Sequence, residues 1–514
     1  MKSTAIAWTI AGSDSGAGAG IQADIKTMQG LSVYCCSAIT AVTGQNTRGV
    51  FGIEPMSSSM VQLQLKALSD DFQPTAIKLG MLYSADIIET ISQMLGSMKI
   101  PIIYDPVMLA TSGDALMDGS ALQAVRSKIL PVSTLITPNW AEAHYLTGRA
   151  IANPSVLNEQ ELDLYVEKLA SDLLGLGPKS VLLKGGHFGN KFCQDFWTDG
   201  KSRAWFTSLR QQTTRTHGSG CTLSAAIAAS LAKQLNVFES IVIAKAYVNQ
   251  GINRAPRVGS INGPLAHLGM EFEEQDLPWL TEAAEQGRHR SRFERDERIG
   301  FYPIVPTSQW VHTLAAAGVR TIQLRIKNPS GEQLENEIAS AIELAKAYGC
   351  NLYINDYWEL AIKHRAYGVH LGQEDLLTAN VDTIWRAGLK LGISTHCYEE
   401  VSRTLAVQPS YIAIGPIYPT NTKQMAFAPQ GKTGLARWRK ILNYPLVAIG
   451  GITLNQASEI LAAGADGIAV VRDITEHSDP AARSQQWLHL FATLSPSAAD
   501  QVSHMAKAIP RSTC

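Results

Sequence analysis

The sequence predicts two α/β domains, an open sheet with helices on both faces in the first half and an eight-stranded (β/α)8 barrel in the second. Three observations predict this division. The chain has 514 residues, which suits two or three domains of ordinary size. Short apolar runs alternate with helical patterns in both halves, as in sheets built from crossover units. A charge-dense segment, residues 271–298, separates the halves.

Six short apolar runs of the first half are predicted to be strands. They are Ala5–Gly12, Ser37–Val42, Ala76–Met81, Ile102–Val107, Leu135–Thr137 and Val181–Gly185. Helical patterns fill the gaps between them. We therefore expect an open α/β sheet over residues 1–270.

The segment 271–298 is predicted to be a solvated linker helix. Arginines alternate there with acidic residues such as Glu294, Asp296 and Glu297. A basic patch for nucleic acid is the other interpretation, but the acids neutralise the run and favour the linker.

Eight apolar runs follow the linker, and each is predicted to be a strand. They are Phe301–Val305, Thr321–Arg325, Asn351–Asn355, Gly368–Gly372, Lys390–Thr395, Tyr411–Pro416, Pro445–Gly451 and Gly467–Val471. Eight strand–helix units predict a TIM barrel over residues 299–497. Residues 498–514 are expected to form a C-terminal tail.

Composition excludes several classes of protein. Lys and Arg total 44 against 45 Asp and Glu, which disfavours binding to nucleic acid through bulk charge. The seven cysteines contain no C-x-x-C pair, so a disulfide scaffold or a zinc site is not expected and a cytoplasmic location is favoured. No apolar run is long enough to span a membrane. The sequence leaves open whether the chain forms a homo-oligomer.

A glycine-rich segment in the first half predicts an anion site. Residues 217–222 read His-Gly-Ser-Gly-Cys-Thr and lead into the apolar helix Leu223–Leu231. Free N–H groups at a helix start bind anions, and the helix dipole there favours a Cys221 thiolate. The plain alternative is a glycine-rich helix cap with a buried cysteine.

Polar residues at three other strand ends extend this prediction. Asn139 and Glu142 are three residues apart, a pair that can orient a hydrated Mg²⁺ near phosphates. Lys184 ends another strand and offers a cation to a transferring phosphoryl group, and Asp105 ends a third. A nucleotide-binding P-loop is not found. The pattern predicts a kinase without one.

Polar residues also cluster at the carboxyl ends of the barrel strands, where barrel active sites lie. Asp356 and Asp375 can share a Mg²⁺ through oxygen ligands. Three bases, Arg325, Lys327 and Lys423, would surround the same mouth and suit a diphosphate leaving group. A second phosphate fits near Thr420, Thr422 and the pair Gly450-Gly451. Ordinary surface ion pairs are the alternative.

Six segments of the first half resemble those of hydroxymethylpyrimidine/phosphomethylpyrimidine kinases. They are Ala11–Gly16, Gly18–Lys26, Gln45–Thr47, Lys78–Met81, Asp105–Met108 and Gly218–Thr222. The resemblance covers roughly residues 4–260. It implies a ribokinase-like fold that uses Mg²⁺ and ATP to phosphorylate the pyrimidine alcohol and then its monophosphate.

The resemblance also implies residue roles in the first half. Gly12, Asp24 and Gln45 would bind the pyrimidine, and Cys221 would be the catalytic base. The backbone from Gly218 through Cys221 would form the anion hole.

Six segments of the second half resemble those of thiamine phosphate synthases, which join the pyrimidine diphosphate to thiazole phosphate and release pyrophosphate. They are Gln323–Lys327, Ile354–Asp356, Gly368–Asp375, Gly392–His396, Gly415–Lys423 and Ala448–Ile452. The resemblance implies that Asp356 and Asp375 hold Mg²⁺. The residues implied for the pyrimidine diphosphate are Gln323, Arg325, Lys327, Asn355, Ser394 and Lys423. Those implied for the thiazole phosphate are Thr420, Asn421, Thr422, Gly451, Val471 and Arg472.

Arg472 departs from the family pattern, which usually has Ser there. Its guanidinium would either pair with the thiazole phosphate or point to solvent, where Asp473 is adjacent in the chain. The solvent-facing or salt-bridged arrangement is the favoured expectation.

Together the two halves predict a bifunctional enzyme of thiamine biosynthesis whose partners are small molecules. One alternative is a pyridoxal-type kinase fused to the same barrel. Another is a non-catalytic protein that binds or regulates within the thiamine pathway. Gln45 and Cys221 disfavour the first alternative, and the intact acids and bases of the barrel disfavour the second.

Overall fold

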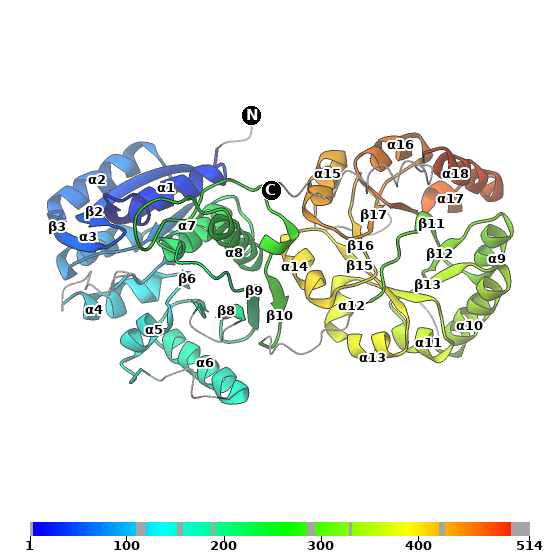
Figure 1. Ribbon diagram of the computed structural model, residues 1–514, viewed down its shortest axis with the longest axis horizontal. Coiled ribbons are helices and arrows are strands. Elements are labelled where there is room, and N and C mark those ends of the chain that lie inside the picture. The colour runs from blue at the N-terminus through cyan, green and yellow to red at the C-terminus, as the bar shows by residue number, and fades with distance from the viewer. Residues whose placement is uncertain are drawn as a thin grey trace, which may run out of the picture. The chain divides into compact units, whose positions relative to one another are not determined.

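The computed structural model describes residues 4–108, 120–151, 158–186, 191–284, 293–327, 331–420 and 427–494. The chain forms two compact units, which are drawn in Figure 1. The first unit comprises residues 1–289 with 397–406, and the second comprises residues 290–396 with 407–514.

The first unit contains an open sheet of ten strands in the order β10-β9-β8-β7-β6-β5-β4-β1-β2-β3. Six central strands run parallel, and antiparallel pairs extend the sheet at both edges. The strands are β1 (Ile6–Asp14), β2 (Tyr34–Asn46), β3 (Gly49–Pro55), β4 (Ala76–Leu79), β5 (Ile102–Tyr104), β6 (Leu135–Ile136), β7 (Val181–Leu183), β8 (Phe192–Thr198), β9 (Arg203–Leu209) and β10 (Trp279–Thr281). The prediction of an open α/β sheet is therefore confirmed.

Four antiparallel strands, β3, β8, β9 and β10, were not among the predicted ones, and β10 lies inside the predicted linker. Residues Trp279–Thr281 pair with β9, and Glu274–Asp276 form a 3-10 turn (η4). The described part of the segment 271–298 therefore contains a strand and a turn where a linker helix was expected. Main-chain pairing with β9 supplies the hydrogen bonds that a solvated helix would have made internally.

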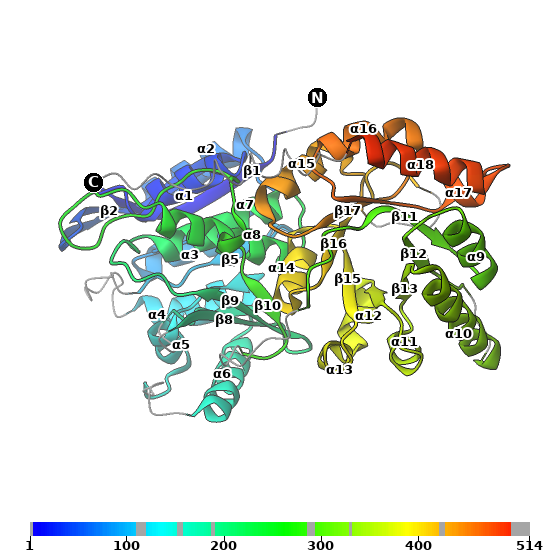
Figure 2. The same ribbon diagram turned by 45° about the vertical axis from the view of Figure 1, so that its right-hand side comes forward.

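Helices cover both faces of this sheet (Figures 1 and 2). Apolar residues of α2, α3, α5 and α6 form one core with Trp8 and Ile10 of β1. On the other face α7 packs against both α1 and α8. The helices are α1 (Gly20–Gly30), α2 (Ser58–Asp71), α3 (Ala85–Leu95), α4 (Ala121–Ala124), α5 (Trp140–Thr147), α6 (Glu159–Leu174), α7 (Ser219–Ala232) and α8 (Val237–Asn253). Two short turns, η1 (Val125–Ile129) and η2 (Leu130–Val132), follow α4.

The second unit contains a closed barrel of eight parallel strands in sequence order. The strands are β11 (Gly300–Val305), β12 (Thr321–Leu324), β13 (Asn351–Asn355), β14 (Gly368–Leu371), β15 (Lys390–Thr395), β16 (Tyr411–Ile414), β17 (Leu446–Ile449) and β18 (Gly467–Val470). Each predicted run lies on one of these strands to within two residues. The prediction of a (β/α)8 TIM barrel is confirmed.

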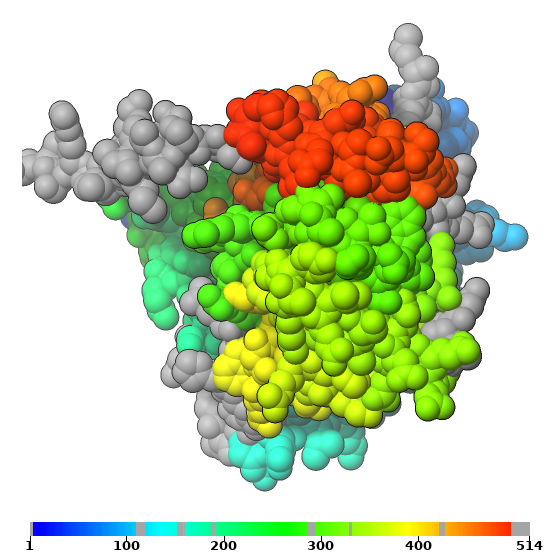
Figure 3. Space-filling model, turned by 90° about the vertical axis from the view of Figure 1, so that its right-hand side faces the viewer, coloured from blue at the N-terminus to red at the C-terminus, as the bar shows by residue number. Residues whose placement is uncertain are grey.

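Helices alternate with the barrel strands. They are α9 (Ser308–Ala316), α10 (Gly331–Tyr348), α11 (Trp358–Lys363), α12 (Gln373–Thr378), α13 (Val381–Arg386), α14 (Tyr398–Val407), α15 (Gly431–Ile441), α16 (Leu454–Ala462), α17 (Arg472–Thr475) and α18 (Pro480–Leu494). The last helix, α18, packs against α9 and β11, and it is drawn in red in Figure 3. Among the described residues, no helix combines the length and apolar composition that a bilayer crossing requires.

Three tyrosines fill the inside of the barrel. Tyr302, Tyr353 and Tyr411 are at most 1% exposed, and their rings meet edge to face with centroids 5.3–6.0 Å apart. Two strand glycines make room for them. A Cβ atom on Gly392 would lie 2.1 Å from the Tyr411 ring, and one on Gly368 would lie 2.5 Å from Tyr353.

Candidate active sites

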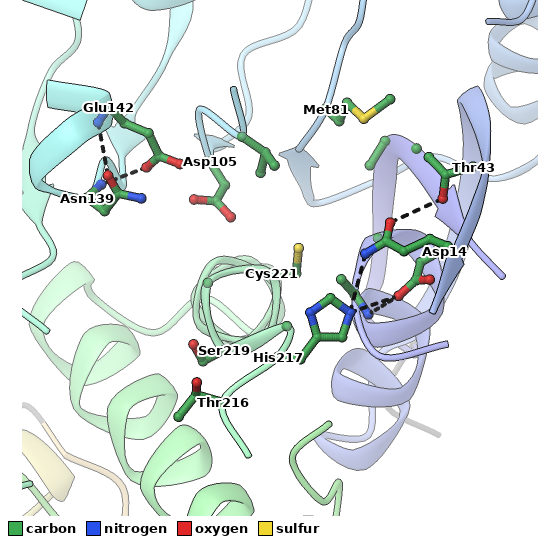
Figure 4. Close-up of a pocket in the computed structure, with 18 of the residues that line it drawn as sticks. Asp14, Thr43, Met81, Asp105, Asn139, Glu142, Thr216, His217, Ser219 and Cys221 are labelled. Atoms are coloured by element: carbon green, nitrogen blue, oxygen red, sulfur yellow. Dashed lines mark hydrogen bonds and ion pairs between the residues drawn. The ribbon is translucent and has the colours of Figure 1, made fainter. Parts of the chain in front are cut away.

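A pocket of about 500 Å³ opens at the carboxyl ends of the parallel strands of the first unit. This is the edge at which ligands bind in open α/β sheets. Figure 4 shows Asp105, Asn139 and Glu142 on one side and Asp14 and Thr43 on the other. The sulfur of Cys221 lies between these two walls.

Nine of the predicted kinase residues line this pocket. They are Gly12, Gln45, Asp105, Asn139, Glu142, Lys184, Gly218, Gly220 and Cys221. They come from six separate stretches of the chain, and the fold brings them together. The structure therefore gathers into one pocket the residues that the sequence placed at separate strand ends and at one helix start.

Asp24, which was expected at the pyrimidine, is the exception, because it does not line this pocket. Its side chain is 0% exposed and does not belong to the pocket lining. It accepts hydrogen bonds from Lys78 (2.8 and 3.0 Å) and from the Thr9 hydroxyl (2.6 Å). Asp24 projects from α1 into the layer beneath the pocket, where it neutralises the buried lysine.

Lys78 is a site residue that the sequence analysis did not single out. It is 0% exposed in β4, yet its side chain lines the pocket. Burial alone would lower its pKa, but the nearby Asp24, Cys221 and Asp105 raise it, so the ammonium stays charged. A charged residue inside an apolar strand is unusual, and this feature of the sequence could have identified Lys78 as a candidate site residue.

The start of α7 has the glycine backbone that the expected anion site requires. Gly218 caps the helix with φ of +80°, and a Cβ there would lie 1.8 Å from the Gly18 carbonyl oxygen. Only glycine can adopt this backbone so close to another chain segment. The first N–H groups of α7 thus face the pocket without side chains in front of them.

Cys221 lies in the first turn of α7 and is 9% exposed. Burial raises the pKa of its thiol to about 11, although Lys78 and a hydrogen bond from the Gly20 N–H act in the opposite direction. The expected thiolate is therefore not the resting form at neutral pH. Loss of solvation outweighs the helix dipole here.

A charged wall faces Cys221 across the pocket. Lys184 donates to Asp105 at 2.8 Å and lies 3.7 Å from Glu142. Burial raises the pKa of Glu142 to about 7, Lys184 opposes this rise, and Asp105 adds to it. Because two acids share the ammonium of Lys184, the wall has an excess of negative charge that suits a hydrated cation.

Asn139 and Glu142 also have a structural role. The Asn139 side chain accepts from the Glu142 N–H, and Glu142 accepts from the Asn139 N–H at 2.7 Å. This capping box begins α5. The cap fixes both side chains at the pocket edge, so their three-residue spacing serves the helix as well as the site.

The opposite wall contains two further residues that the sequence analysis missed. Asp14 accepts hydrogen bonds from the N–H groups of Gly16, Gly18 and Ala19, which orders the loop between β1 and α1. His217 lies 3.2 Å from Asp14 and 3.5 Å from the Gln45 amide. Gln45 is thereby held toward the pocket. An aspartate at a strand end before a glycine-rich loop was the available signal.

In the second unit, the predicted metal ligands meet at the carboxyl ends of β13 and β14. Asp356 and Asp375 lie within hydrogen-bonding reach of each other. Burial and the charge of Asp375 raise the pKa of Asp356 to about 6, while Arg325 and Asn355 act in the opposite direction. Two facing carboxylates that repel each other fit a divalent cation.

Gln323 and Ser394, both predicted to bind the pyrimidine diphosphate, are joined to a buried histidine and two tyrosines. The Gln323 amide donates to Tyr302 at 3.1 Å, and the Ser394 hydroxyl lies 2.8 Å from His370. Burial and the nearby charge of Arg325 together lower the pKa of His370 to about 4, so the ring is neutral. Lys327, also predicted for this ligand, has an exposed side chain.

The structure describes part of the site predicted to bind the thiazole phosphate. Gly451 has φ of +68°, and a Cβ there would lie 2.5 Å from the Pro419 carbonyl oxygen, so the backbone of Tyr418 and Pro419 lies against it. Val471 caps α17, and Arg472 begins it with an exposed side chain. Asp473 pairs with Arg483 at 2.8 Å. Thr420 ends the described segment, and Asn421, Thr422 and Lys423 lie outside the described residues.

Comparisons with known proteins match both units. Residues 14–266 match the phosphomethylpyrimidine kinase family, and residues 302–474 match the thiamine monophosphate synthase family. The thiamine biosynthetic bifunctional enzyme TH1 of Arabidopsis thaliana is 34% identical over 483 residues, which are 90% of this chain and 88% of that protein. The chain belongs to the bifunctional thiamine biosynthetic enzymes.

Each domain of this bifunctional enzyme also has single-domain relatives. The thiamine-phosphate synthase of Salmonella schwarzengrund is 53% identical over 194 residues, which are 38% of this chain and 92% of that protein. A Clostridium difficile phosphomethylpyrimidine kinase structure is 35% identical and covers 48% of this chain and 99% of its own, with a TM-score of 0.42. A Staphylococcus aureus pyridoxal kinase structure is 29% identical. The match covers 55% of this chain and 100% of that one, with a TM-score of 0.48.

The bifunctional family combines a ribokinase-like kinase domain with a thiamine phosphate synthase barrel, both of them transferases. The prediction of a two-activity enzyme of thiamine biosynthesis is confirmed. The family match also favours the pyrimidine kinase over the pyridoxal-type alternative.

Proposed function

We propose that the first unit phosphorylates 4-amino-5-hydroxymethyl-2-methylpyrimidine with ATP, first to the monophosphate and then to the diphosphate. The second unit then condenses the diphosphate with thiazole phosphate to give thiamine phosphate and pyrophosphate. The observation that carries this proposal is the pocket in which the Cys221 thiol, the α7 start and the Lys184 ammonium converge. The proposed kinase domain extends past residue 270 to include β10 (Trp279–Thr281), which pairs with β9. The proposed synthase domain begins near residue 299.

In the kinase pocket, the pyrimidine alcohol lies between Gln45, Gly12 and Cys221. The N–H groups of Gly218 through Cys221 and the Lys184 ammonium stabilise the charge on the transferring phosphoryl group. Cys221 accepts the hydroxyl proton. Because burial raises the pKa of the Cys221 thiol to about 11 in the free protein, its proton must first pass to solvent. The ammonium of Lys78 stabilises the thiolate that then accepts the hydroxyl proton.

Asp105, Asn139 and Glu142 would hold the Mg²⁺ that accompanies ATP. Bound there, the ion would neutralise charge on the phosphates. The excess of negative charge around Lys184 supports this assignment.

In the barrel, the proposed mechanism is dissociative. The bond between the pyrimidine methylene carbon and the diphosphate oxygen breaks, and pyrophosphate leaves with the electron pair. The thiazole nitrogen then donates its lone pair to the resulting cation. Gln323, Arg325, Lys327, Asn355, Ser394 and Lys423 bind the diphosphate substrate.

Asp356 and Asp375 would hold Mg²⁺ in the barrel, where the ion would add positive charge beside the leaving pyrophosphate. Thr420, Asn421, Thr422, Gly451 and Val471 bind the thiazole phosphate. The six cysteines of the described residues are free thiols, which supports the proposal of a reducing, cytoplasmic compartment.

One assay tests the proposed function. The full chain receives the hydroxymethylpyrimidine, thiazole phosphate, ATP and Mg²⁺, and thiamine phosphate is measured. A second reaction receives the pyrimidine diphosphate directly, without ATP. Product in both reactions is expected. No product from the substrates of either domain would overturn the proposal.

A further inference from the structure

A continuous series of hydrogen bonds crosses the inside of the barrel. It runs from Gln323 on β12 to Tyr302 on β11 (3.1 Å), then to Tyr411 on β16 (2.9 Å). From Tyr411 it continues to His370 Nδ1 on β14 (2.8 Å), and His370 Nε2 meets the hydroxyl of Ser394 on β15 (2.8 Å). Strands that are not neighbours in the barrel are thus joined by polar side chains in its core.

The inner members are buried away from water. Tyr302 and Tyr411 are 1% and 0% exposed, and Gln323 and His370 are 2% and 4% exposed. Ser394 is half-buried. A buried hydroxyl hydrogen without an acceptor is costly, so each hydrogen in the series should be used.

This requirement gives the series one direction. Gln323 Nε2 donates to Tyr302, so the Tyr302 hydrogen goes to Tyr411 and the Tyr411 hydrogen goes to His370 Nδ1. A neutral imidazole with an accepting Nδ1 carries its hydrogen on Nε2. His370 therefore donates to the Ser394 oxygen, and the Ser394 hydrogen remains available for an acceptor outside the series.

We propose that Tyr302, Tyr411 and His370 are positioning residues that orient the Ser394 hydroxyl as a hydrogen-bond donor toward the diphosphate substrate. This inference rests on the proposed synthase function of the barrel. The Gln323 amide fixes the direction of hydrogen-bond donation at one end of the series. At the other end, the Ser394 hydroxyl hydrogen is left free to donate to the substrate. An anionic phosphate oxygen is the acceptor that binds such a donor most strongly, because hydrogen bonds to charged groups are stronger than those between neutral groups.

The packing of the barrel core supports this role. Gly392 stands two residues before Ser394 on β15, and its missing side chain leaves the space that the Tyr411 ring occupies. The ring of His370 stacks on that of Tyr411 with centroids 5.7 Å apart. The aromatic rings thus hold the hydroxyl groups of the series in place.

The test is a double-mutant cycle on the full chain, supplied directly with the pyrimidine diphosphate and thiazole phosphate. Ser394→Ala and Tyr411→Phe are made singly and together, and kcat and KM are measured for each substrate. Each single variant should lower kcat/KM for the pyrimidine diphosphate by roughly 3- to 10-fold, the effect of one hydrogen bond. The KM for thiazole phosphate should stay within about 2-fold.

The double variant should be little worse than Ser394→Ala alone, because Tyr411 acts through Ser394. Tyr302→Phe, which interrupts the series elsewhere, should show the same coupling. Tyr353→Phe is the matched control. Tyr353 belongs to the same ring cluster, but its hydroxyl donates to Asp296 and not into the series. It should show no coupling to Ser394.

The outcomes separate this inference from the proposed function. If the unaltered chain makes no thiamine phosphate, the proposed function fails. If Ser394→Ala lowers activity but the effect of Tyr411→Phe is additive with it or absent, the positioning role is wrong and the proposed function stands. If Ser394→Ala has no effect, the role of Ser394 and the inference both fail.

Discussion

The ammonium of Lys78 and the carboxylate of Asp24 form an ion pair at 2.8 Å in which both side chains are 0% exposed. The lysine faces the kinase pocket from β4, and the aspartate lies behind it on α1. A buried charge is tolerated only with such a partner, because an isolated one loses its solvation without compensation. The pair thus keeps a positive charge beside Cys221.

Asp24→Asn should destabilise the kinase domain by about 3–5 kcal/mol, because it leaves Lys78 as an uncompensated buried charge. Kinase activity should fall, while synthase activity with the pyrimidine diphosphate should persist. Urea unfolding measures the first effect. The control is Asp70→Asn, which breaks the exposed Lys66–Asp70 pair and should change stability by less than about 1 kcal/mol. Equal effects of the two variants would contradict the structural role of Asp24.

Cys221→Ala should lower the kinase rate at least about 100-fold, because it removes the base beside the anion site. The barrel should condense the pyrimidine diphosphate at its usual rate. Cys36→Ala, at a buried cysteine of β2, is the matched control and should retain kinase activity. Loss of both activities in a folded Cys221→Ala protein would contradict the division into two sites.

Alkylation of Cys221 should depend steeply on pH. Its pKa is raised to about 11, so the thiolate fraction is small at pH 7. As long as the pH stays below the pKa, this fraction rises about tenfold with each unit of pH increase. Peptide mapping after iodoacetamide treatment should show a rate that still rises between pH 8 and 10. A rate that is already constant above pH 8 would indicate a helix-start thiolate instead.

Asp356→Asn and Asp375→Asn should weaken Mg²⁺ binding and slow condensation. Each removes one of the two facing carboxylates, so the leaving pyrophosphate has less charge compensation. The rise in Tm that Mg²⁺ causes should also shrink in these variants. Glu374→Gln, at the exposed carboxylate beside Asp375, is the control and should behave as the unaltered chain does. An unchanged Mg²⁺ profile for condensation would rule out these ligands.

Arg472→Ser should leave the KM for thiazole phosphate within a few-fold. The Arg472 side chain is exposed, and we expect backbone N–H groups to hold the phosphate. The adjacent Asp473 does not compete for it, since it pairs with Arg483. Steady-state kinetics decide the point, because a direct guanidinium–phosphate pair would raise that KM by roughly tenfold or more.

The strands buried on both faces of a parallel sheet could be predicted from the sequence. Such strands are short apolar runs, as in Asn351–Asn355, and this pattern does not depend on their partners. The antiparallel strands of the first sheet, such as Arg203–Leu209 and Trp279–Thr281, carry mixed sequences. Only their neighbours in the fold determine that they are strands.

The candidate residues at strand ends could be predicted for a related reason. Parallel strands bring their carboxyl ends to one edge, so Asp105 and Lys184 were expected to converge, and both line the pocket. Asp24 could not be placed in this way. A helical residue faces whatever packs on its side, and its partner Lys78 lies 54 residues away along the chain.

By itself, the sequence determined the two α/β domains, the order of their strands along the chain and the polar residues at the strand ends, because these depend on local pattern. The tertiary structure decided which polar groups became buried together. Lys78 with Asp24, and His370 between Tyr411 and Ser394, acquire their partners and their protonation from contacts between distant segments. The physical reason is that burial sets the strength of an electrostatic interaction, and burial is a property of the packed fold.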